Sequence, residues 1–281
     1  MDINFTKMQS CGNDYIYFNC FDPHTIITDP VALAVQLSPR RFNIGGDGIV
    51  LMQPTEKADA RMRIFNRDGS EGKMCGNAIR CVAKFLYENK ITDKKNITID
   101  TLSGVKKLAL NIEQGLVLSV RVDMGPAVFN PQKVPVNLVG DSVINRRILI
   151  GSDTYEITCI SMGNPHAVVF HNDVDALNLS EIGPDFANNP LFPDSVNTEF
   201  VQFIHESHLK MRVWERGSGE TLACGTGACA SAVAAVLNGY CKKNTDITVQ
   251  MPGGDLVIQY TDETVFMTGD CKITFRGVVT V

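Results

Sequence analysis

Two cysteines, Cys75 and Cys224, are each followed by a glycine and then by an apolar helical pattern. They lie 149 positions apart, and the residues around them recur in the same order in 62–81 and 211–229. Each copy has a strand-like run that begins Met-Arg, then a Gly-Ser turn, then Cys-Gly and an apolar run with helical periodicity. We therefore interpret the chain as an internal duplication that places one cysteine at the start of a helix in each half.

A thiol at a helix N-terminus lies beside unpaired backbone N–H groups and the positive end of the helix dipole, and both favour the thiolate. With Gly76 and Gly225 next to the cysteines, the same N–H groups can approach a carboxylate closely. Two such thiols on opposite sides of one carbon could remove a proton from one face and return one to the other. The alternative is that both are core cysteines, which is how we interpret the remaining seven: Cys11, Cys20, Cys81, Cys159, Cys229, Cys241 and Cys271.

The helical runs behind the two cysteines differ in character. The first has an apolar face with three charged residues off it; the face is Ile79, Val82, Ala83 and Leu86, and the charged residues are Arg80, Lys84 and Glu88. The second, 228–237, is almost wholly small and apolar, which predicts a helix buried on all sides.

Further landmarks recur between the halves, each with nearly the same offset. Gly12-Asn13 matches Gly163-Asn164, strand-like 97–104 matches 247–254, and 116–127 matches 265–271. Each half is thus several strands with one principal helix, in addition to a short helix expected at 29–37. We predict an α/β fold of the α+β type, with two pseudosymmetric domains, each a mixed, mainly antiparallel sheet wrapped round a central helix. The first domain is 1–122 plus the C-terminal strand 270–281, and the second is 123–269.

The two Gly-Asn pairs lie in turns between apolar segments, where an asparagine either stabilises the turn or faces a ligand. His166 follows the second pair closely and is the one histidine whose position suggests a site. The glycine-rich segment 40–48 lacks the Gly-Lys-Ser/Thr ending of a phosphate-binding loop, so it gives no support for nucleotide binding.

Composition favours small-molecule chemistry. The 281 residues carry a formal net charge of −5 without a run of Lys or Arg, so nothing indicates a nucleic-acid or membrane-surface partner. We find neither a signal-peptide pattern nor an apolar span of membrane length. Nine irregularly spaced cysteines without a paired C-x-x-C predict reduced thiols rather than a disulfide framework or a zinc site, and we expect a cytoplasmic protein with no metal.

In several motifs the sequence resembles diaminopimelate epimerase over its full length. The motifs are Gly12-Asn13-Asp14, Asn66, Met74-Cys75-Gly76-Asn77, Gly163-Asn164-Pro165-His166, Asn197-Thr198-Glu199-Phe200, Glu215-Arg216-Gly217-Ser218-Gly219-Glu220-Thr221 and Ala223-Cys224-Gly225-Thr226-Gly227. The resemblance implies a cofactor-independent epimerase that interconverts LL- and meso-2,6-diaminoheptanedioate, with its site in a cleft between two domains. It is compatible with a homodimer.

The resemblance also implies a role for each matching residue. Cys75 and Cys224 would be the acid/base thiols, and the reacting carboxylate would be bound by Gly76, Asn77, Gly225 and Thr226. The rest of the substrate would be bound by Asn13, Asn66, Asn164, Asn197, Glu215 and Arg216, with His166 as an auxiliary group. Where some relatives have Gln, this chain has Gly48, and we assign no contact there.

Two other functions fit parts of the pattern. Proline racemases and hydroxyproline epimerases also use two cysteines, but their first motif typically has His where this chain has Asn77, and they need no pair such as Glu215-Arg216. A binding or redox-sensing module with two reactive thiols would use the same residues without turnover. Such a binder would leave the α-hydrogen of its ligand in place.

Overall fold

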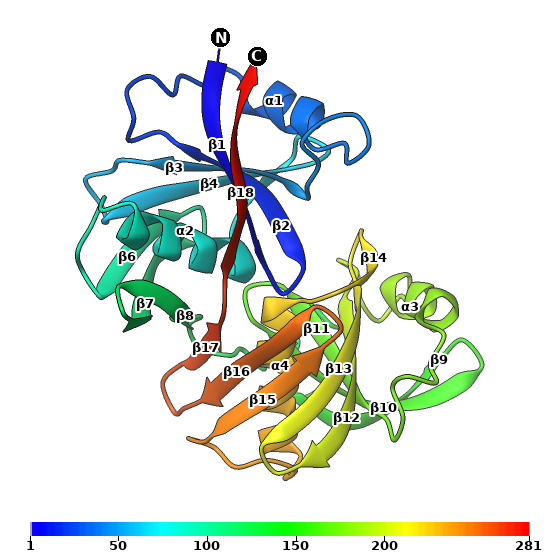
Figure 1. The fold of residues 1–281 in the computed structure, drawn as a ribbon. Coiled ribbons are helices and arrows are strands. Elements are labelled where there is room, and N and C mark those ends of the chain that lie inside the picture. Colours follow the sequence, from blue (N-terminus) through cyan, green and yellow to red (C-terminus); the bar gives the residue numbers. More distant parts are fainter. Residues whose placement is uncertain (1, 281) are drawn as a thin grey trace. The chain divides into compact units, whose positions relative to one another are not determined.

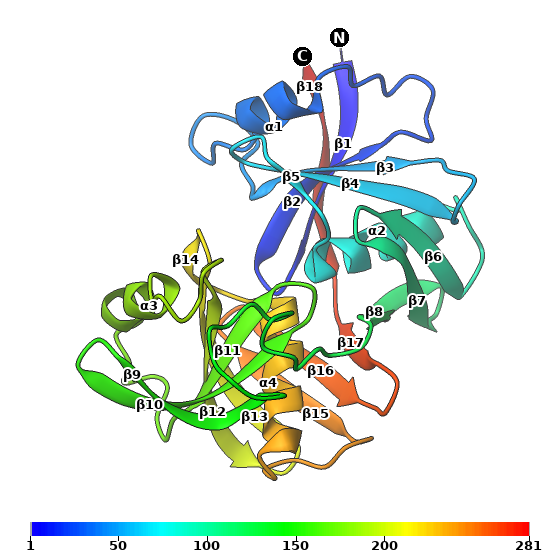
Figure 2. The ribbon, with the colours of Figure 1, turned by 180° about the vertical axis from the view of Figure 1, so that it is seen from behind.

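The computed structural model describes residues 2–280 and divides into two compact units. The first comprises Met1–Asp123 with Thr268–Val281, and the second comprises Met124–Met267. Met1 and Val281, the outer ends of the expected first domain, lie outside the described residues. Figures 1 and 2 show strands and a few helices in each unit. No helix within 2–280 is long and apolar enough to cross a membrane.

The first unit is a mixed, mainly antiparallel sheet. β1 pairs antiparallel with β2, β3 with β4, β6 with β7 and β7 with β8, whereas the pairs β2–β3 and β4–β6 are parallel. Its strands are β1 (Asp2–Ser10), β2 (Asn13–Asn19), β3 (Gly48–Gln53), β4 (Ala60–Asn66), β5 (Glu71–Gly72), β6 (Asn96–Thr101), β7 (Gly104–Glu113), β8 (Leu116–Asp123) and β18 (Lys272–Thr280).

The second unit repeats these pairings in the same order. β10–β11, β12–β13 and β15–β16 are antiparallel, and β11–β12 and β13–β15 are parallel. Its strands are β9 (Val143–Ile150), β10 (Asp153–Ser161), β11 (Pro165–Phe170), β12 (Asn197–His205), β13 (His208–Glu215), β14 (Gly219–Thr221), β15 (Asp246–Met251), β16 (Gly254–Tyr260) and β17 (Val265–Gly269), the last reaching just beyond the boundary between the units. The mixed α/β fold is therefore the one expected from the sequence.

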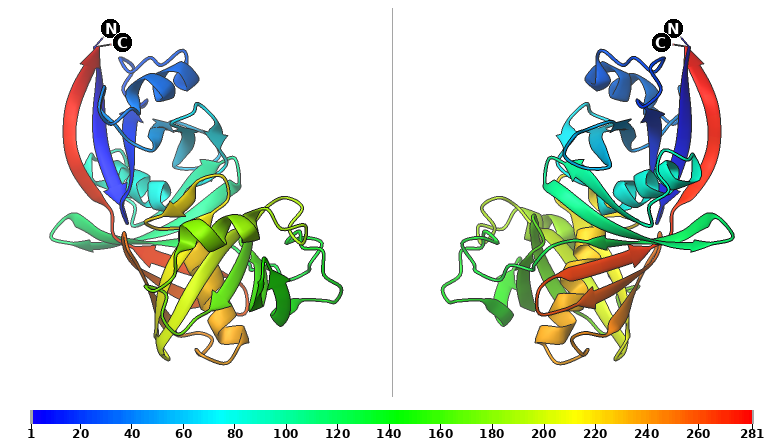
Figure 3. Two further views of the ribbon diagram at one scale, coloured as in Figure 1. Left: turned by 90° about the vertical axis from the view of Figure 1, so that its right-hand side faces the viewer. Right: turned by 90° about the vertical axis from the view of Figure 1, so that its left-hand side faces the viewer.

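In each unit one added strand pairs with the first strand of the repeat, and the two added strands enter from different places in the chain. In the first unit β18, the strand-like tail of the sequence, pairs antiparallel with β1, and the two run side by side in Figures 1 and 3. In the second unit β9 pairs antiparallel with β10 in the equivalent place. Both pairings give the first strand of the repeat a partner on each side.

The principal helices are α2 (Gly76–Glu88) and α4 (Gly225–Leu237), and each begins immediately after its cysteine. α4 packs against β10, β11, β12, β13, β15 and β16 of its own sheet, which explains why its sequence is small and apolar on all sides. Each helix connects two parallel strands, β4 to β6 and β13 to β15. The two parallel strands therefore fix the position of the helix start and of the cysteine that precedes it.

Each sheet also carries a shorter helix within its other parallel crossover. α1 (Pro30–Leu37) starts at Asp29, whose side chain accepts a hydrogen bond from the Ala32 N–H. α3 (Leu179–Ala187) lies between β11 and β12 and was not predicted from the sequence. These helices cover apolar clusters that include Phe18 and Phe65 in the first unit and Phe186 and Phe200 in the second.

Candidate active site

In the first unit the candidate residues are built on the start of α2. Cys75 is the residue that precedes the helix, with extended backbone angles (φ −137°, ψ 119°), and its carbonyl accepts the N–H of Ile79 at 3.0 Å. Gly76 is the first helical residue and is buried. The sequence thus places a half-buried thiol beside the N–H groups of a first helical turn, as expected.

Asn13, at the start of β2, connects this thiol to a carboxylate. The Cys75 thiol donates to Asn13 Oδ1 at 3.3 Å, while Asn13 Nδ2 donates to Asp47 Oδ2 at 2.7 Å. Asp47 is itself held by Arg40, whose guanidinium also pairs with Asp14. Burial acts to raise the pKa of Asp14, but the guanidinium of Arg40 and the ammonium of Lys7 outweigh it and hold that pKa below its usual range.

Arg80 corrects one expectation. The helical pattern placed it off the apolar face, but its side chain is fully buried. Its guanidinium donates to Asn77 Oδ1 at 2.8 Å, to the Gly76 carbonyl at 3.1 Å and to the Ser10 hydroxyl. A buried cation must be satisfied by acceptors, and here the acceptors include two groups of the first turn of α2. Arg80 therefore fixes the helix end that carries Cys75.

Two further positions of the first unit, Asn66 and Gly48, are determined by contacts with neighbouring residues. Asn66 ends β4, and its Nδ2 donates to the Ser70 hydroxyl in the following turn at 3.0 Å. Gly48 begins β3 with φ +154°, and a Cβ there would lie 2.0 Å from the Phe65 carbonyl oxygen. The close backbone approach requires glycine at position 48, so this position offers no side chain to a ligand.

In the second unit the candidate residues are built on the start of α4, where burial opposes the thiolate. Burial raises the pKa of the Cys224 thiol well above its ordinary value, and the nearby carboxylates of Glu215 and Glu199 raise it further. Hydrogen bonds from the Thr226 hydroxyl and the Gly227 N–H act in the opposite direction but do not outweigh burial. The N–H group of the helix start favours the Cys224 thiolate, as expected, but desolvation and two neighbouring negative charges, which were not evident from the sequence, act against it.

A chain of polar contacts leads from a buried carboxylate to Cys224. His166 is fully buried; its Nδ1 is 2.7 Å from Glu199 Oε1, and its Nε2 is 3.0 Å from Asn164 Oδ1. Asn164 Nδ2 donates to Thr226 Oγ1 at 3.2 Å, and that hydroxyl is 3.5 Å from Cys224 Sγ. Burial raises the pKa of Glu199, although the attraction and hydrogen bond of His166 oppose this shift.

Asn197, Glu215 and Arg216 form a separate polar group at the ends of β12 and β13. Asn197 is buried, and its Oδ1 accepts the Arg216 N–H at 2.9 Å while its Nδ2 donates to the Pro165 carbonyl at 3.0 Å. The Arg216 guanidinium is exposed and donates to the Asp194 carbonyl at 2.9 Å. Glu215 is half-buried and accepts a hydrogen bond from the Thr221 hydroxyl.

The networks contain residues that were not assigned from the sequence, among them Asp47, Arg80 and Glu199. Glu199 offered a signal, since it is a carboxylate in a strand that continues into the apolar Phe200 and Val201, where a buried charge needs a partner. Asp47 follows two glycines in a loop, and only the fold brings it to Asn13. Within 2–280 no group of three or more His, Cys, Asp or Glu side chains is arranged to hold a metal ion.

Solved structures similar to this chain include an epimerase and a phenazine biosynthesis protein. A hydroxyproline epimerase from Agrobacterium vitis has a TM-score of 0.68 at 16% identity and covers 99% of this chain and 92% of its own. A phenazine biosynthesis protein of the PhzF family from Bacillus anthracis has a TM-score of 0.71 at 15% identity, covering both chains fully. At these identities the likeness establishes the fold class, a duplicated α/β architecture.

Sequence comparison identifies the family. The diaminopimelate epimerase family model matches residues 5–130 and 158–274. A diaminopimelate epimerase of Acetivibrio thermocellus is 47% identical over 279 residues, covering 99% of this chain and 98% of the relative. One from Methanococcus maripaludis is 47% identical over 281 residues, covering 99% and 100%. The chain belongs to the diaminopimelate epimerase family and is therefore an isomerase.

Proposed function

We propose that this protein interconverts LL- and meso-2,6-diaminoheptanedioate by two-base proton transfer at one α-carbon, without a cofactor. The observation that carries the mechanism is the repeated helix start: Cys75 and Cys224 each precede a glycine that opens the principal helix of its unit. Membership of the diaminopimelate epimerase family supports the choice of this substrate. Such a reaction supplies the meso isomer for lysine biosynthesis and, in bacteria, for peptidoglycan.

In this proposal the two thiols act on opposite faces of the substrate. A thiolate takes the α-proton and becomes a thiol, and the second thiol gives its proton to the other face and becomes a thiolate. The substrate gains and loses one proton, so its composition is unchanged and only the configuration inverts. Because the raised pKa of Cys224 keeps it protonated in the empty protein, Cys224 is suited to begin as the proton donor.

The carbanion needs stabilisation because an amino-acid α-proton is very weakly acidic. We assign the reacting carboxylate to the N–H groups at the starts of α2 and α4, with Gly76, Asn77, Gly225 and Thr226 as binding residues. Fixed N–H donors in a water-poor site stabilise the charge that develops on that carboxylate. His166 assists by holding Asn164 in place beside Thr226.

The distal end of diaminopimelate carries a second carboxylate and a second ammonium group. Arg216 offers a cation and Glu215 an acceptor for these groups. Asn13, Asn66, Asn164 and Asn197 are assigned to the remaining polar atoms. Proline offers no second amino-acid centre, so the Glu215-Arg216 pair favours diaminopimelate over a proline-type substrate.

We further propose that the two compact units are the two epimerase domains of the duplication, corresponding to the expected 1–122 with 270–281 and 123–269. A cytoplasmic location follows from a biosynthetic role and from chemistry that needs reduced thiols. A homodimer stays a prediction, which sedimentation of the purified protein tests.

The proposal is tested with protein treated with EDTA and hydroxylamine to remove metal and pyridoxal phosphate, then assayed with LL-diaminopimelate and with L-proline. We expect meso product from the first substrate and no racemisation of the second. Cys75→Ser and Cys224→Ser should each lower kcat/KM by at least about 100-fold, the scale of losing a general acid or base. Racemisation of proline without conversion of diaminopimelate would refute the assignment.

A further inference from the structure

Asp47 determines which end of the Asn13 amide faces Cys75. An ionised carboxylate can only accept hydrogen bonds, so Asp47 Oδ2 at 2.7 Å must face the NH₂ end of Asn13. The carbonyl end is then turned to Cys75, whose thiol donates to it at 3.3 Å. A carbonyl oxygen beside sulfur favours the protonated thiol, whereas an N–H there would favour the thiolate.

The position of Asp47 is itself fixed. Its Oδ1 accepts from Arg40 at 3.0 Å, and its Oδ2 also accepts the backbone N–H of Asp14 at 3.1 Å. Its backbone N–H donates to the Asp14 carbonyl at 2.7 Å, and its carbonyl accepts the Arg67 N–H at 3.0 Å. These contacts hold the carboxylate in place, so it presents an acceptor oxygen to the Asn13 side chain.

The equivalent asparagine of the second unit has the opposite orientation. Asn164 directs its Oδ1 to His166 Nε2 and its Nδ2 to Thr226, whose hydroxyl is the group beside Cys224. The duplicated Gly-Asn turns thus present different ends of the amide toward the two thiols. The partner behind each asparagine also differs, a carboxylate in one unit and an imidazole in the other.

We propose that Asp47 is a positioning residue that, by orienting Asn13, holds Cys75 as a hydrogen-bond-donating thiol in the substrate-free protein. The inference rests on the proposed function only for the role of Cys75 as a catalytic thiol. Asp47 need not touch the substrate for this role. It acts through Asn13 alone.

The experiment measures iodoacetamide alkylation of the Cys75 peptide as a function of pH, by mass spectrometry, without substrate. In Asp47→Asn the new amide can donate to Asn13, which can then turn its own N–H toward the sulfur. We expect the pH midpoint of alkylation to fall by about one unit, the effect of one hydrogen bond. A change in accessibility alone would scale the rate at every pH without moving the midpoint.

Two comparisons isolate the route through Asn13. Asp14→Asn removes a charge from the same cluster without touching the Asn13 side chain, so it should shift the midpoint much less. In an Asn13→Ala background, Asp47→Asn should cause no further shift. Equal shifts in Asp47→Asn and Asp14→Asn, or a shift that persists without Asn13, would overturn the proposal.

Asn13→Ala by itself gives a second test if Asp47→Asn does not fold. Losing a carbonyl acceptor should lower the midpoint, whereas losing an N–H donor would raise it, and a rise contradicts the proposed orientation. None of these alkylation measurements depends on turnover, so their outcome is independent of whether the protein epimerises diaminopimelate. An active enzyme with an unshifted midpoint would refute the role of Asp47 and leave the proposed function standing.

Discussion

The environment of Cys224 makes its reactivity strongly dependent on pH. Burial, Glu215 and Glu199 raise its pKa, so the nucleophilic thiolate forms only at pH values above those at which an ordinary thiol ionises. We expect alkylation of the Cys224 peptide in substrate-free protein to stay slow at pH 8 and to rise at higher pH. Mass mapping of alkylated peptides measures this. Rapid labelling of Cys224 at pH 7 would show that the helix end outweighs burial.

The buried pair of His166 and Glu199 should contribute to stability as well as to orientation. Glu199→Leu leaves the imidazole without its carboxylate in a fully buried place and should destabilise the protein by about 3 kcal/mol. Urea unfolding followed by the fluorescence of the single tryptophan, Trp214, measures the loss.

Thr198→Val is the matched control for this substitution. It alters the neighbouring residue of the same strand, whose buried hydroxyl has no hydrogen-bond partner, and should cost less than about 1 kcal/mol. Equal losses in the two variants would mean that the pair contributes nothing specific.

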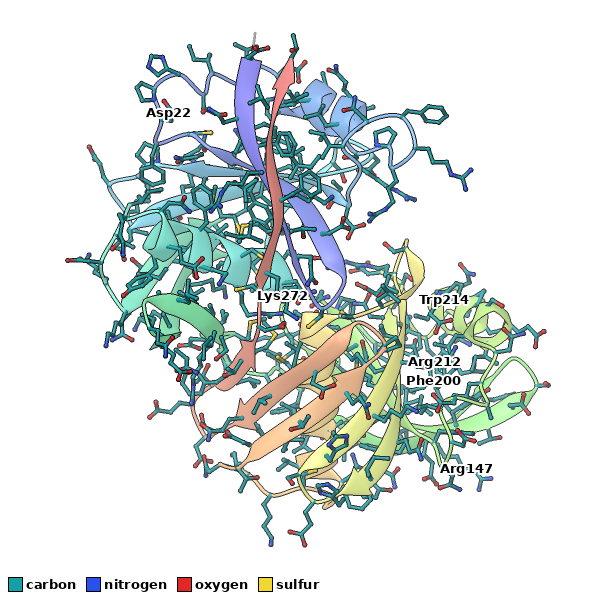
Figure 4. The ribbon with its side chains drawn as sticks, viewed as in Figure 1. Asp22, Arg147, Phe200, Arg212, Trp214 and Lys272 are labelled. Carbon is teal, nitrogen blue, oxygen red and sulfur yellow. The ribbon has the colours of Figure 1, made fainter. Side chains whose placement is uncertain are left out.

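At the scale of the elements, the packing of α3 depends on the absence of a side chain at Gly183. A Cβ at Gly183 would lie 2.2 Å from Cδ2 of Trp214, so the helix packs directly on the indole of β13, the strand that ends at Glu215 (Figure 4). Gly183→Ala should therefore displace the helix or the ring and destabilise the second unit by about 1–3 kcal/mol.

The control for this prediction is Gly72→Ala, where an added Cβ meets only ordinary contacts at 3.7 Å or more. It should change the free energy of unfolding by less than about 0.5 kcal/mol. Thermal unfolding of both variants, followed by Trp214 fluorescence and circular dichroism, provides the comparison. A Gly183→Ala protein as stable as the wild type would show that α3 packs differently.

Elements with a strong sequence period were predictable, and those set by tertiary contacts were not. The strands around Met62 and Met211 and the helices after the cysteines could be recognised because their apolar spacing is regular. α3 was missed because Gly183 and Pro184 interrupt its pattern, and its stability comes from packing on Trp214. The burial of Arg80 was missed because its acceptors come from β1 and from the chain near Asp270, far away in sequence.

The site was predictable to a similar extent. The duplication singled out Cys75 and Cys224 and predicted a helix start behind each. It could not give the protonation preference of Cys224, since Glu199 and Glu215 approach it only through the folded sheet. Nor could it give the opposite amide orientations of Asn13 and Asn164, because these depend on partners supplied by other segments.

At the scale of the whole molecule, the last strand of the chain completes the sheet that the first strand begins. β18 pairs with β1 from Asp2↔Thr280 to Gln9↔Lys272, and Gly277 leaves room for the ring of Phe5. Removal of residues 272–281 should expose an edge of β1 and lower the melting temperature by about 10 °C or more, or prevent folding.

Val278→Thr is the control, since this side chain is 61% exposed and the substitution keeps the strand. It should melt within about 2 °C of the wild type. A truncated protein with the melting temperature of the full chain, measured by circular dichroism, would mean that β18 is not needed to complete the first unit.

The central claim, proton exchange by two thiols on one α-carbon, is tested most directly by early-time turnover of LL-diaminopimelate in D₂O with reduced, cofactor-free protein. We predict that the meso product carries deuterium at the inverted α-carbon while the remaining LL substrate keeps its hydrogen, because one thiol removes hydrogen and the other delivers solvent deuterium. Deuterium entering the remaining LL substrate as fast as the product, or product that retains the original α-hydrogen, would contradict the account.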